Sequence, residues 1–200
     1  MNLFRVIIIL MIGLSPICCK NQTNKTTKLE NENSEKENNY LITEKGVLGL
    51  FIGEIMPETL ENFKLIKSVK IVEGGNQEPI INLIKDNTEL LQIGFEYDQG
   101  KGNFNNKIGE IIIKDKRFRT EKNIGVESTI DDFINSYSNY QIWYTYISGR
   151  YVIQSKDMKV QFILDESGYS GKKNLMESDM IELKKEDFSL NTRIIRIRIY

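Results

Sequence analysis

The sequence predicts an α+β fold in which a largely antiparallel, twisted β-sheet is accompanied by two short helices. Short apolar runs rich in Ile, Val, Leu and Tyr recur between clusters of Gly, Asn and Asp, which is typical of strands joined by tight turns. Two segments instead show the apolar spacing of a helix. Near the end of the chain, Ile195, Ile197 and Ile199 alternate with Arg196, Arg198 and Tyr200, which predicts a strand at 192–200 with one solvent-facing side.

The first residues are typical of a bacterial export signal. Arg5 supplies positive charge, residues 6–14 are a nine-residue apolar run, and Cys18 and Cys19 follow shortly after. Nine apolar residues are too few to span a hydrocarbon core of about 30 Å, so a signal-peptide core is predicted. A cysteine at this boundary resembles the lipobox of bacterial lipoproteins, whose thiol carries the lipid. Cys19 is preferred over Cys18 because bulky Ile17 precedes Cys18.

These features divide the chain into a lipoprotein signal peptide (1–18), a tether (19–39) and one β-rich domain (40–200). The tether holds a single large apolar residue, Leu29, so it cannot bury enough surface to offset the entropy of ordering, and disorder is predicted. We expect a protein of the bacterial cell envelope that is lipid-anchored, on the outer membrane or facing the periplasm. An ordinary secretory signal or an uncleaved anchor is the alternative.

The composition excludes several classes of catalytic site. The chain has no His and its two Cys lie in the leader, so the domain lacks Ser-His-Asp, Cys-His and Cys/His zinc chemistry. Lys plus Arg (27) nearly equals Asp plus Glu (28), so no overall basic field favours nucleic acid. We expect no cofactor, no metal and no nucleic-acid partner, whereas carboxylate, Lys, Tyr or Ser chemistry stays open.

The first half of the domain is predicted to contain a helix among strands. Residues 57–65 have Pro at the start and Leu60 and Phe63 on one face, which predicts a short helix. Strands are predicted at 47–52, 68–73, 80–85, 90–98 and 108–114.

The second half begins with the second predicted helix, 128–137, in which Ser128 is the N-cap and Asp131 completes a capping box. Strands are predicted at 141–147, 151–155, 159–164 and 192–200, and residues 165–187 are predicted to be irregular. The starts of the two helices share a pattern about 70 residues apart, each after a strand and a glycine (Gly53 and Gly125). The pattern is compatible with two strand–turn–helix–meander repeats. It is equally compatible with a chance similarity between two helix starts.

Four segments carry a shared pattern, namely IIIKDKRFRT (111–120), IGVESTIDDF (124–133), GVLG (46–49) and MPETL (56–60). Together they resemble a family of small bacterial envelope lipoproteins of unknown function, typified by the sigma-E-regulated lipoprotein of enteric bacteria. At Glu127 the family pattern has a glycine. The resemblance covers residues 45–165 and implies a periplasmic or surface lipoprotein, with no reaction, ligand or catalytic residue.

Two groups of residues are candidate partner-binding positions. If the last strand is an edge, Arg193, Arg196 and Arg198 form a basic stripe that could hold phosphates or carboxylates bidentately. Protection of an edge strand against aggregation is the alternative role of these charges. Trp143 and Tyr144 would bind sugar rings or a protein if exposed, and packing under the second helix is the alternative.

Three functions follow as hypotheses. The preferred one is a non-enzymatic module that binds an envelope protein, lipid or cell-wall partner near the membrane. The second is a tandem-repeat inhibitor or assembly-type partner-binding lipoprotein. The third is a carboxylate-based glycan hydrolase, which requires two carboxyl groups about 5–10 Å apart in a cleft. Asp131, Asp132 and Glu127 are interpreted as helix-start residues rather than as such a pair or as metal ligands.

Overall fold

The computed structural model describes residues 40–200, which belong to one compact unit. The predicted signal peptide, the lipidation site and the tether lie outside the described residues. Within residues 40–200, none of the helices has the length and hydrophobicity that a membrane span requires.

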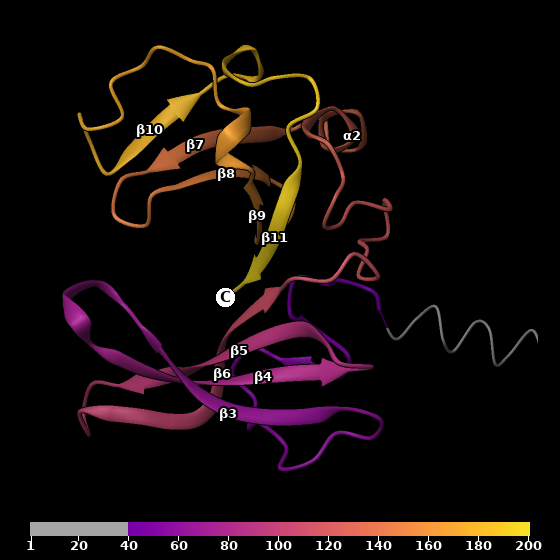
Figure 1. The fold of residues 1–200 in the computed structure, drawn as a ribbon, viewed down its shortest axis with the longest axis vertical. Helices are drawn as coiled ribbons and strands as arrows, with labels where there is room; N and C mark the ends of the chain where they lie inside the picture. Colours follow the sequence, from indigo (N-terminus) through magenta and orange to yellow (C-terminus); the bar gives the residue numbers. More distant parts are fainter. Residues whose placement is uncertain (1–39) are drawn as a thin grey trace, which may run out of the picture. The chain divides into compact units, whose positions relative to one another are not determined.

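Nine strands of the described chain form one antiparallel sheet, which can be followed in Figure 1. Its order is β10-β7-β8-β9-β11-β6-β5-β4-β3. The strands are β3 (Lys64–Ile71), β4 (Gln77–Lys85), β5 (Thr88–Asp98), β6 (Asn103–Ile113), β7 (Tyr140–Thr145), β8 (Arg150–Ser155), β9 (Val160–Leu164), β10 (Met180–Leu183) and β11 (Ile194–Ile199). The hairpin of β1 (Gly46–Val47) and β2 (Leu50–Phe51) and the helix α2 (Ile130–Ser136) lie outside this sheet.

One face of the sheet carries the main hydrophobic core. Ile111 and Ile113 of β6 are fully buried there, as are Ile197 and Ile199 of β11, because alternate residues of a strand point to the same face. Helix α2 covers part of this face, and its Phe133 ring lies 4.9 Å from the Phe162 ring of β9, measured between centroids. The predicted β-rich α+β class with antiparallel strands is therefore confirmed.

The second predicted helix is confirmed, but its cap lies one residue later than predicted. The hydroxyl of Thr129 accepts a hydrogen bond from the Asp132 N–H (3.1 Å), and the Asp132 carboxylate accepts one from the Thr129 N–H (2.8 Å). Ser128 cannot cap the helix, because its hydroxyl accepts hydrogen bonds from the Arg119 guanidinium (2.9 Å) and the Gly125 N–H (3.1 Å).

The predicted helix at 57–65 is wrong. In the part of the chain that the structure describes, this segment contains a turn in which the Phe63 N–H donates to the Leu60 carbonyl (3.1 Å), and Asn62 has a φ of 66°. The strand β3 begins directly afterwards at Lys64, so too few residues remain to offset the cost of starting a helix. The two segments of the proposed repeat thus have different local structures, and the repeat is not confirmed.

The predicted strand at 47–52 is interrupted. Leu48 and Gly49 adopt φ values of 55° and 75°, which reverse the chain between β1 and β2. A tight hairpin therefore replaces the continuous strand. The predicted irregular segment 165–187 also differs in part, since it contains the edge strand β10 between two 3₁₀ turns, Glu166–Gly168 and Lys185–Asp187.

The last strand lies inside the sheet and is not an edge. It pairs with β9 on one side and β6 on the other. The pairing shifts register between Ile194 and Arg196, and this bulge leaves Ile195 41 % exposed. The predicted alternation therefore fails at Ile195 and holds from Arg196 onward, with Ile197 in the core and Arg198 on the opposite face.

Candidate functional site

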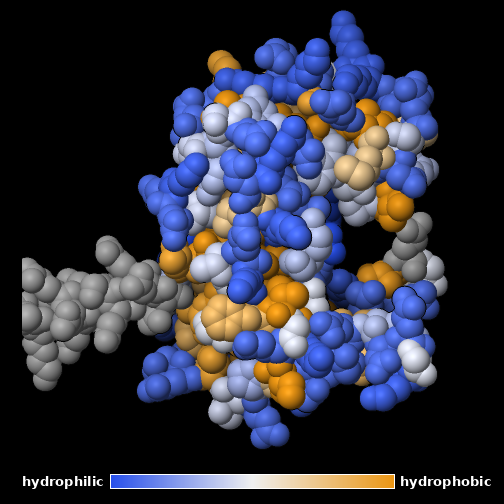
Figure 2. Space-filling model, turned by 180° about the vertical axis from the view of Figure 1, so that it is seen from behind, coloured by the Kyte–Doolittle hydropathy of each residue, from blue (hydrophilic) through white to orange (hydrophobic). Residues whose placement is uncertain are grey.

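The sheet face opposite the main core carries a cavity of about 750 Å³. Its lining comes from the end of β3, from the β7–β8 turn, from the start of β10 and from the middle strands of the sheet. Figure 2 shows this side as a hollow with hydrophilic residues along it and hydrophobic residues at its edges. A cavity of this volume falls in the range that small-molecule ligands occupy.

Strand pairing brings apolar and basic residues together on this face. Trp143, Val152, Ile163 and Arg196 lie directly opposite one another in a row across β7, β8, β9 and β11. The three apolar members form a small buried cluster of their own, separate from the main core. Arg150 lies two residues before Val152 in the same strand and therefore faces the same side.

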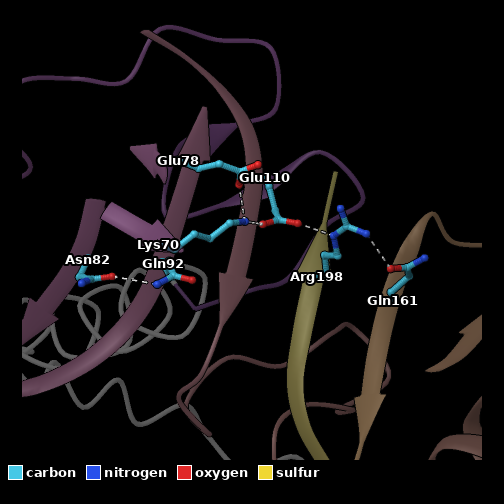
Figure 3. Close-up of polar contacts among 7 residues, drawn as sticks. All are labelled: Lys70, Glu78, Asn82, Gln92, Glu110, Gln161 and Arg198. Atoms are coloured by element: carbon cyan, nitrogen blue, oxygen red, sulfur yellow. Dashed lines mark hydrogen bonds and ion pairs between the residues drawn. The ribbon is translucent and has the colours of Figure 1, made fainter. Parts of the chain in front are cut away.

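A chain of polar contacts crosses the floor of the cavity (Figure 3). The Lys70 ammonium of β3 lies 3.0 Å from the Glu78 carboxylate and 3.3 Å from that of Glu110 in β6. Glu110 also accepts a hydrogen bond from Arg198 (2.5 Å), which in turn donates to the Gln161 side-chain carbonyl (3.3 Å). These contacts connect five strands, β3, β4, β6, β11 and β9, through their side chains.

Two features explain the geometry and the charge state of Glu110. Gly94 of β5 lies opposite Glu110, so no side chain separates the carboxylate from Lys70. Burial alone would raise the pKa of Glu110, but the charges of Arg198 and Lys70 outweigh it and hold the pKa below its ordinary value. Glu110 is therefore ionised near neutral pH.

Two guanidinium groups at the cavity are without an acidic partner. Within residues 40–200, neither Arg150 nor Arg196 makes a side-chain hydrogen bond or an ion pair, whereas Arg198 is held by Glu110. Burial lowers the pKa of Arg150, Glu110 opposes this, and the charges of Arg196 and Arg198 lower it further. Arginine nevertheless stays protonated in proteins. The site thus holds positive charge that an anion would stabilise.

The edge of the cavity is apolar. Ile71 of β3, Ile147 of the β7–β8 turn and Met180 of β10 all line it, and they are 74 %, 66 % and 61 % exposed. Single exposed apolar residues are normal on protein surfaces, but these three come from different elements and together form an exposed apolar rim around one cavity.

The structure brings three of the five predicted partner-binding residues to this cavity, namely Arg196, Arg198 and Trp143. Arg193 precedes the bulge of β11, is exposed, and does not line the cavity. Tyr144 packs against the main core on the other face, with its ring 4.9 Å from that of Tyr151. Trp143 does not pack under the helix, since α2 covers the opposite face. Their role in binding stays a prediction.

Sequence reasoning did not identify Arg150, Lys70, Glu110 and Gln161 as members of this site. These residues come from four strands and share no local motif, so only the strand order brings them together. The sequence contained one signal for Arg150. The turn at Ser148-Gly149 places Arg150 at the start of a strand, two residues before Val152 and therefore on the same face.

The other candidates have structural roles. Asp132 belongs to the helix cap, Asp131 forms an ion pair with Lys185, and the Glu127 carboxylate lies 3.6 Å from the Lys116 ammonium. Glu127 also has a φ of 71°, the left-handed region that glycine adopts without strain. Among the residues described, no group of three or more acidic, His or Cys side chains could hold a metal ion.

The fold and this face define the protein as a β-rich domain with one antiparallel nine-stranded sheet. A similar fold occurs in the crystal structure of the uncharacterized protein yfeY from Escherichia coli, with a TM-score of 0.53 and 15 % sequence identity. The match covers 80 % of this chain and 98 % of that chain, and it shows a shared fold alone. No protein-family model and no curated protein match the chain.

Proposed function

We propose that the chain is a lipid-anchored protein of the bacterial envelope whose domain binds an anionic partner in the sheet cavity and catalyses no reaction. The observation that carries the binding role is the presence of Arg150 and Arg196 at this cavity, both without an acidic partner in the described part. Guanidinium groups bind carboxylates and phosphates through paired hydrogen bonds. Envelope lipids, cell-wall polymers and acidic proteins all carry such groups.

The envelope location is supported by the sequence, and the fold comparison adds a bacterial protein of similar fold. The apolar leader ends in Cys19 and a polar segment separates it from the domain. The sequence resembles envelope lipoproteins typified by an enteric member, and the fold is similar to that of an uncharacterised protein of an enteric bacterium. These observations agree with one another.

The hydrolase hypothesis receives less support from this geometry. The carboxylates of Glu78 and Glu110 lie close together, but both contact the Lys70 ammonium. A glycosidase acid needs a raised pKa so that it holds a proton near neutral pH, whereas that of Glu110 is lowered. The repeat-based binder requires two superposable units, and the missing helix at 57–65 argues against them.

Anion binding can be tested on the domain alone. Residues 40–200 belong to one compact unit with its own core, and the matched solved chain is almost fully covered, so the domain is expected to fold by itself. Isothermal titration with inorganic pyrophosphate at low salt should show binding that weakens as salt rises. The Arg150→Gln/Arg196→Gln variant should bind at least tenfold more weakly, whereas Arg193→Gln should bind like the wild type. Equal affinity of all three proteins, or no binding, would refute the proposal.

The anchor requires the full chain. Labelled palmitate should enter the wild type and the Cys18→Ser variant, which serves as the matched control, and both should fractionate with membranes. The Cys19→Ser variant should take up no label and leave the membrane fraction. Unchanged labelling and fractionation of Cys19→Ser would contradict the predicted lipidation site.

A further inference from the structure

The charged part of the cavity is suited to the head group of a ligand. Lys70 and Arg198 are neutralised by Glu78 and Glu110, which leaves the guanidinium groups of Arg150 and Arg196. The remaining acidic residue of the lining, Asp179, belongs to the segment that leads into β10. An oxyanion at the two arginines would replace water around the half-buried Arg150 and the exposed Arg196, and it would accept hydrogen bonds from several N–H groups.

The apolar part is suited to a hydrocarbon chain. Ile71 and Val72 line the cavity from the β3 end, and Ile147 and Met180 line it from β7–β8 and β10. These elements are far apart in the sequence, yet Figure 1 shows the β3–β4 hairpin and the β7–β8 turn on the same side of the domain. Water around exposed isoleucine and methionine is released when a methylene chain covers them.

The charged part and the apolar part of the cavity lie next to each other on the same face of the sheet. Arg196 lies opposite Ile163, and the row continues through Val152 to Trp143, so an apolar floor starts directly beside the guanidinium groups. A ligand that satisfies both parts is anionic at one end and apolar at the other. The volume of about 750 Å³ fits one chain rather than a bilayer surface or a folded partner.

We infer that the cavity binds a single-chain amphiphile with an oxyanion head group, with the head at Arg150 and Arg196 and the chain against Ile71, Ile147 and Met180. This inference rests on the proposed anion-binding function and names its ligand class. The head group is a carboxylate or a phosphate, since both accept paired hydrogen bonds from guanidinium groups. A ligand of this kind would come from the lipids among which the anchored protein is proposed to lie.

Titration of the domain with four probes tests the inference. Octyl phosphate has both the anionic head group and the hydrocarbon chain, and inorganic phosphate has the head group alone. Octyl glucoside has the chain without a charge, and octylammonium has the chain with a positive charge. Octyl phosphate should bind roughly 200-fold more tightly than inorganic phosphate, because about four buried methylenes contribute ~0.8 kcal/mol each and 1.4 kcal/mol is tenfold. Octyl glucoside and octylammonium should bind no better than inorganic phosphate. Octanoate as a fifth probe assigns the head group to the carboxylate or the phosphate class.

Variants at exposed positions separate the two parts of the ligand. Ile147→Asn/Met180→Asn should remove most of the advantage of octyl phosphate and leave inorganic phosphate binding unchanged. Leu190→Asn is the matched control, because this residue is 73 % exposed and does not line the cavity. Circular dichroism verifies that each variant is folded.

The outcomes distinguish the inference from the function on which it rests. If inorganic phosphate binds as tightly as octyl phosphate, the amphiphile is refuted and anion binding stands. If octylammonium or octyl glucoside equals octyl phosphate, or if no anion binds, the proposed anion-binding function fails as well. Loss of octyl phosphate affinity in Leu190→Asn to the same extent as in the double variant would also refute the assigned chain site.

Discussion

Replacement of Glu110 by Gln tests the polar network that joins β3, β4, β6, β11 and β9 beneath the cavity. The Glu110 side chain is 18 % exposed and accepts from both Lys70 and Arg198. Hydrogen bonds to charged groups contribute about 1.5–3 kcal/mol each. Because Lys70 keeps Glu78 and Arg198 keeps Gln161, we expect Glu110→Gln to lower the free energy of unfolding by about 2 kcal/mol.

The matched control is Glu89→Gln. The Glu89 carboxylate lies 2.7 Å from the Lys114 ammonium, but its side chain is 37 % exposed and, among residues 40–200, neither partner forms a second ion pair. Exposed ion pairs contribute about 0–1 kcal/mol because water and salt screen them, so this variant should be destabilised far less. Urea unfolding of residues 40–200, followed by circular dichroism, measures both differences.

The pH dependence gives a second measurement on the same proteins. The pKa of Glu110 in the folded state lies below its ordinary value of 4.5, so the unfolded state binds the proton first as the pH falls. The stability from Glu110 is therefore complete above that ordinary value and is lost as the pH falls through the folded pKa. The difference between wild type and Glu110→Gln should shrink over this range. A difference that stays constant down to pH values below the folded pKa, or a Glu110→Gln effect no larger than that of Glu89→Gln, would refute the reasoning.

Three further predictions concern stability and use the same urea assay. Within the described residues the buried hydroxyl of Tyr169 has no hydrogen-bond partner, so Tyr169→Phe should raise the free energy of unfolding by about 1 kcal/mol. A lower free energy of unfolding would mean that the hydroxyl has a hydrogen-bond partner after all. Glu127→Gly should raise the free energy of unfolding by about 0.5–1 kcal/mol, because Glu127 has a φ of 71° and its ion pair is exposed. A lower free energy of unfolding would mean that the side chain of Glu127 stabilises the fold more than its backbone strain destabilises it. Thr129→Ala should lower the free energy of unfolding by about 1 kcal/mol through loss of the helix cap, whereas an unchanged value would contradict the observed capping geometry.

Strand positions could be predicted from the sequence because alternation and turn residues are local signals. The segments 80–85, 90–98, 108–114, 151–155 and 159–164 all fall on strands of the structure with modest shifts at their ends. Helix α2 was predictable for the same reason. The segment 57–65 also carried a local helix signal, but the chain enters β3 at Lys64, and pairing in the sheet outweighed a weak helix preference.

Strand order could not be predicted, because it depends on contacts between distant segments. The alternation of Ile and Arg in β11 indicated one polar face, yet nothing local showed that β11 lies between β9 and β6. That position puts Arg198 beside Glu110, 88 residues away in the sequence. The bulge at Ile195 likewise separates Arg193 from the other two arginines. The cavity is therefore a product of topology, and only part of its lining was recognisable from the sequence.

The most direct test of the central claim observes Trp143 while an anion binds. The chain contains one Trp, so its indole N–H gives a single, unambiguous signal in a ¹H–¹⁵N spectrum. Trp143 lines the cavity in the same row as Arg196. Titration of the labelled domain with octyl phosphate should shift this signal in a saturable way, and the shift should vanish in Arg150→Gln/Arg196→Gln. An indole signal that stays in place while the ligand binds would put the binding site elsewhere and contradict the account.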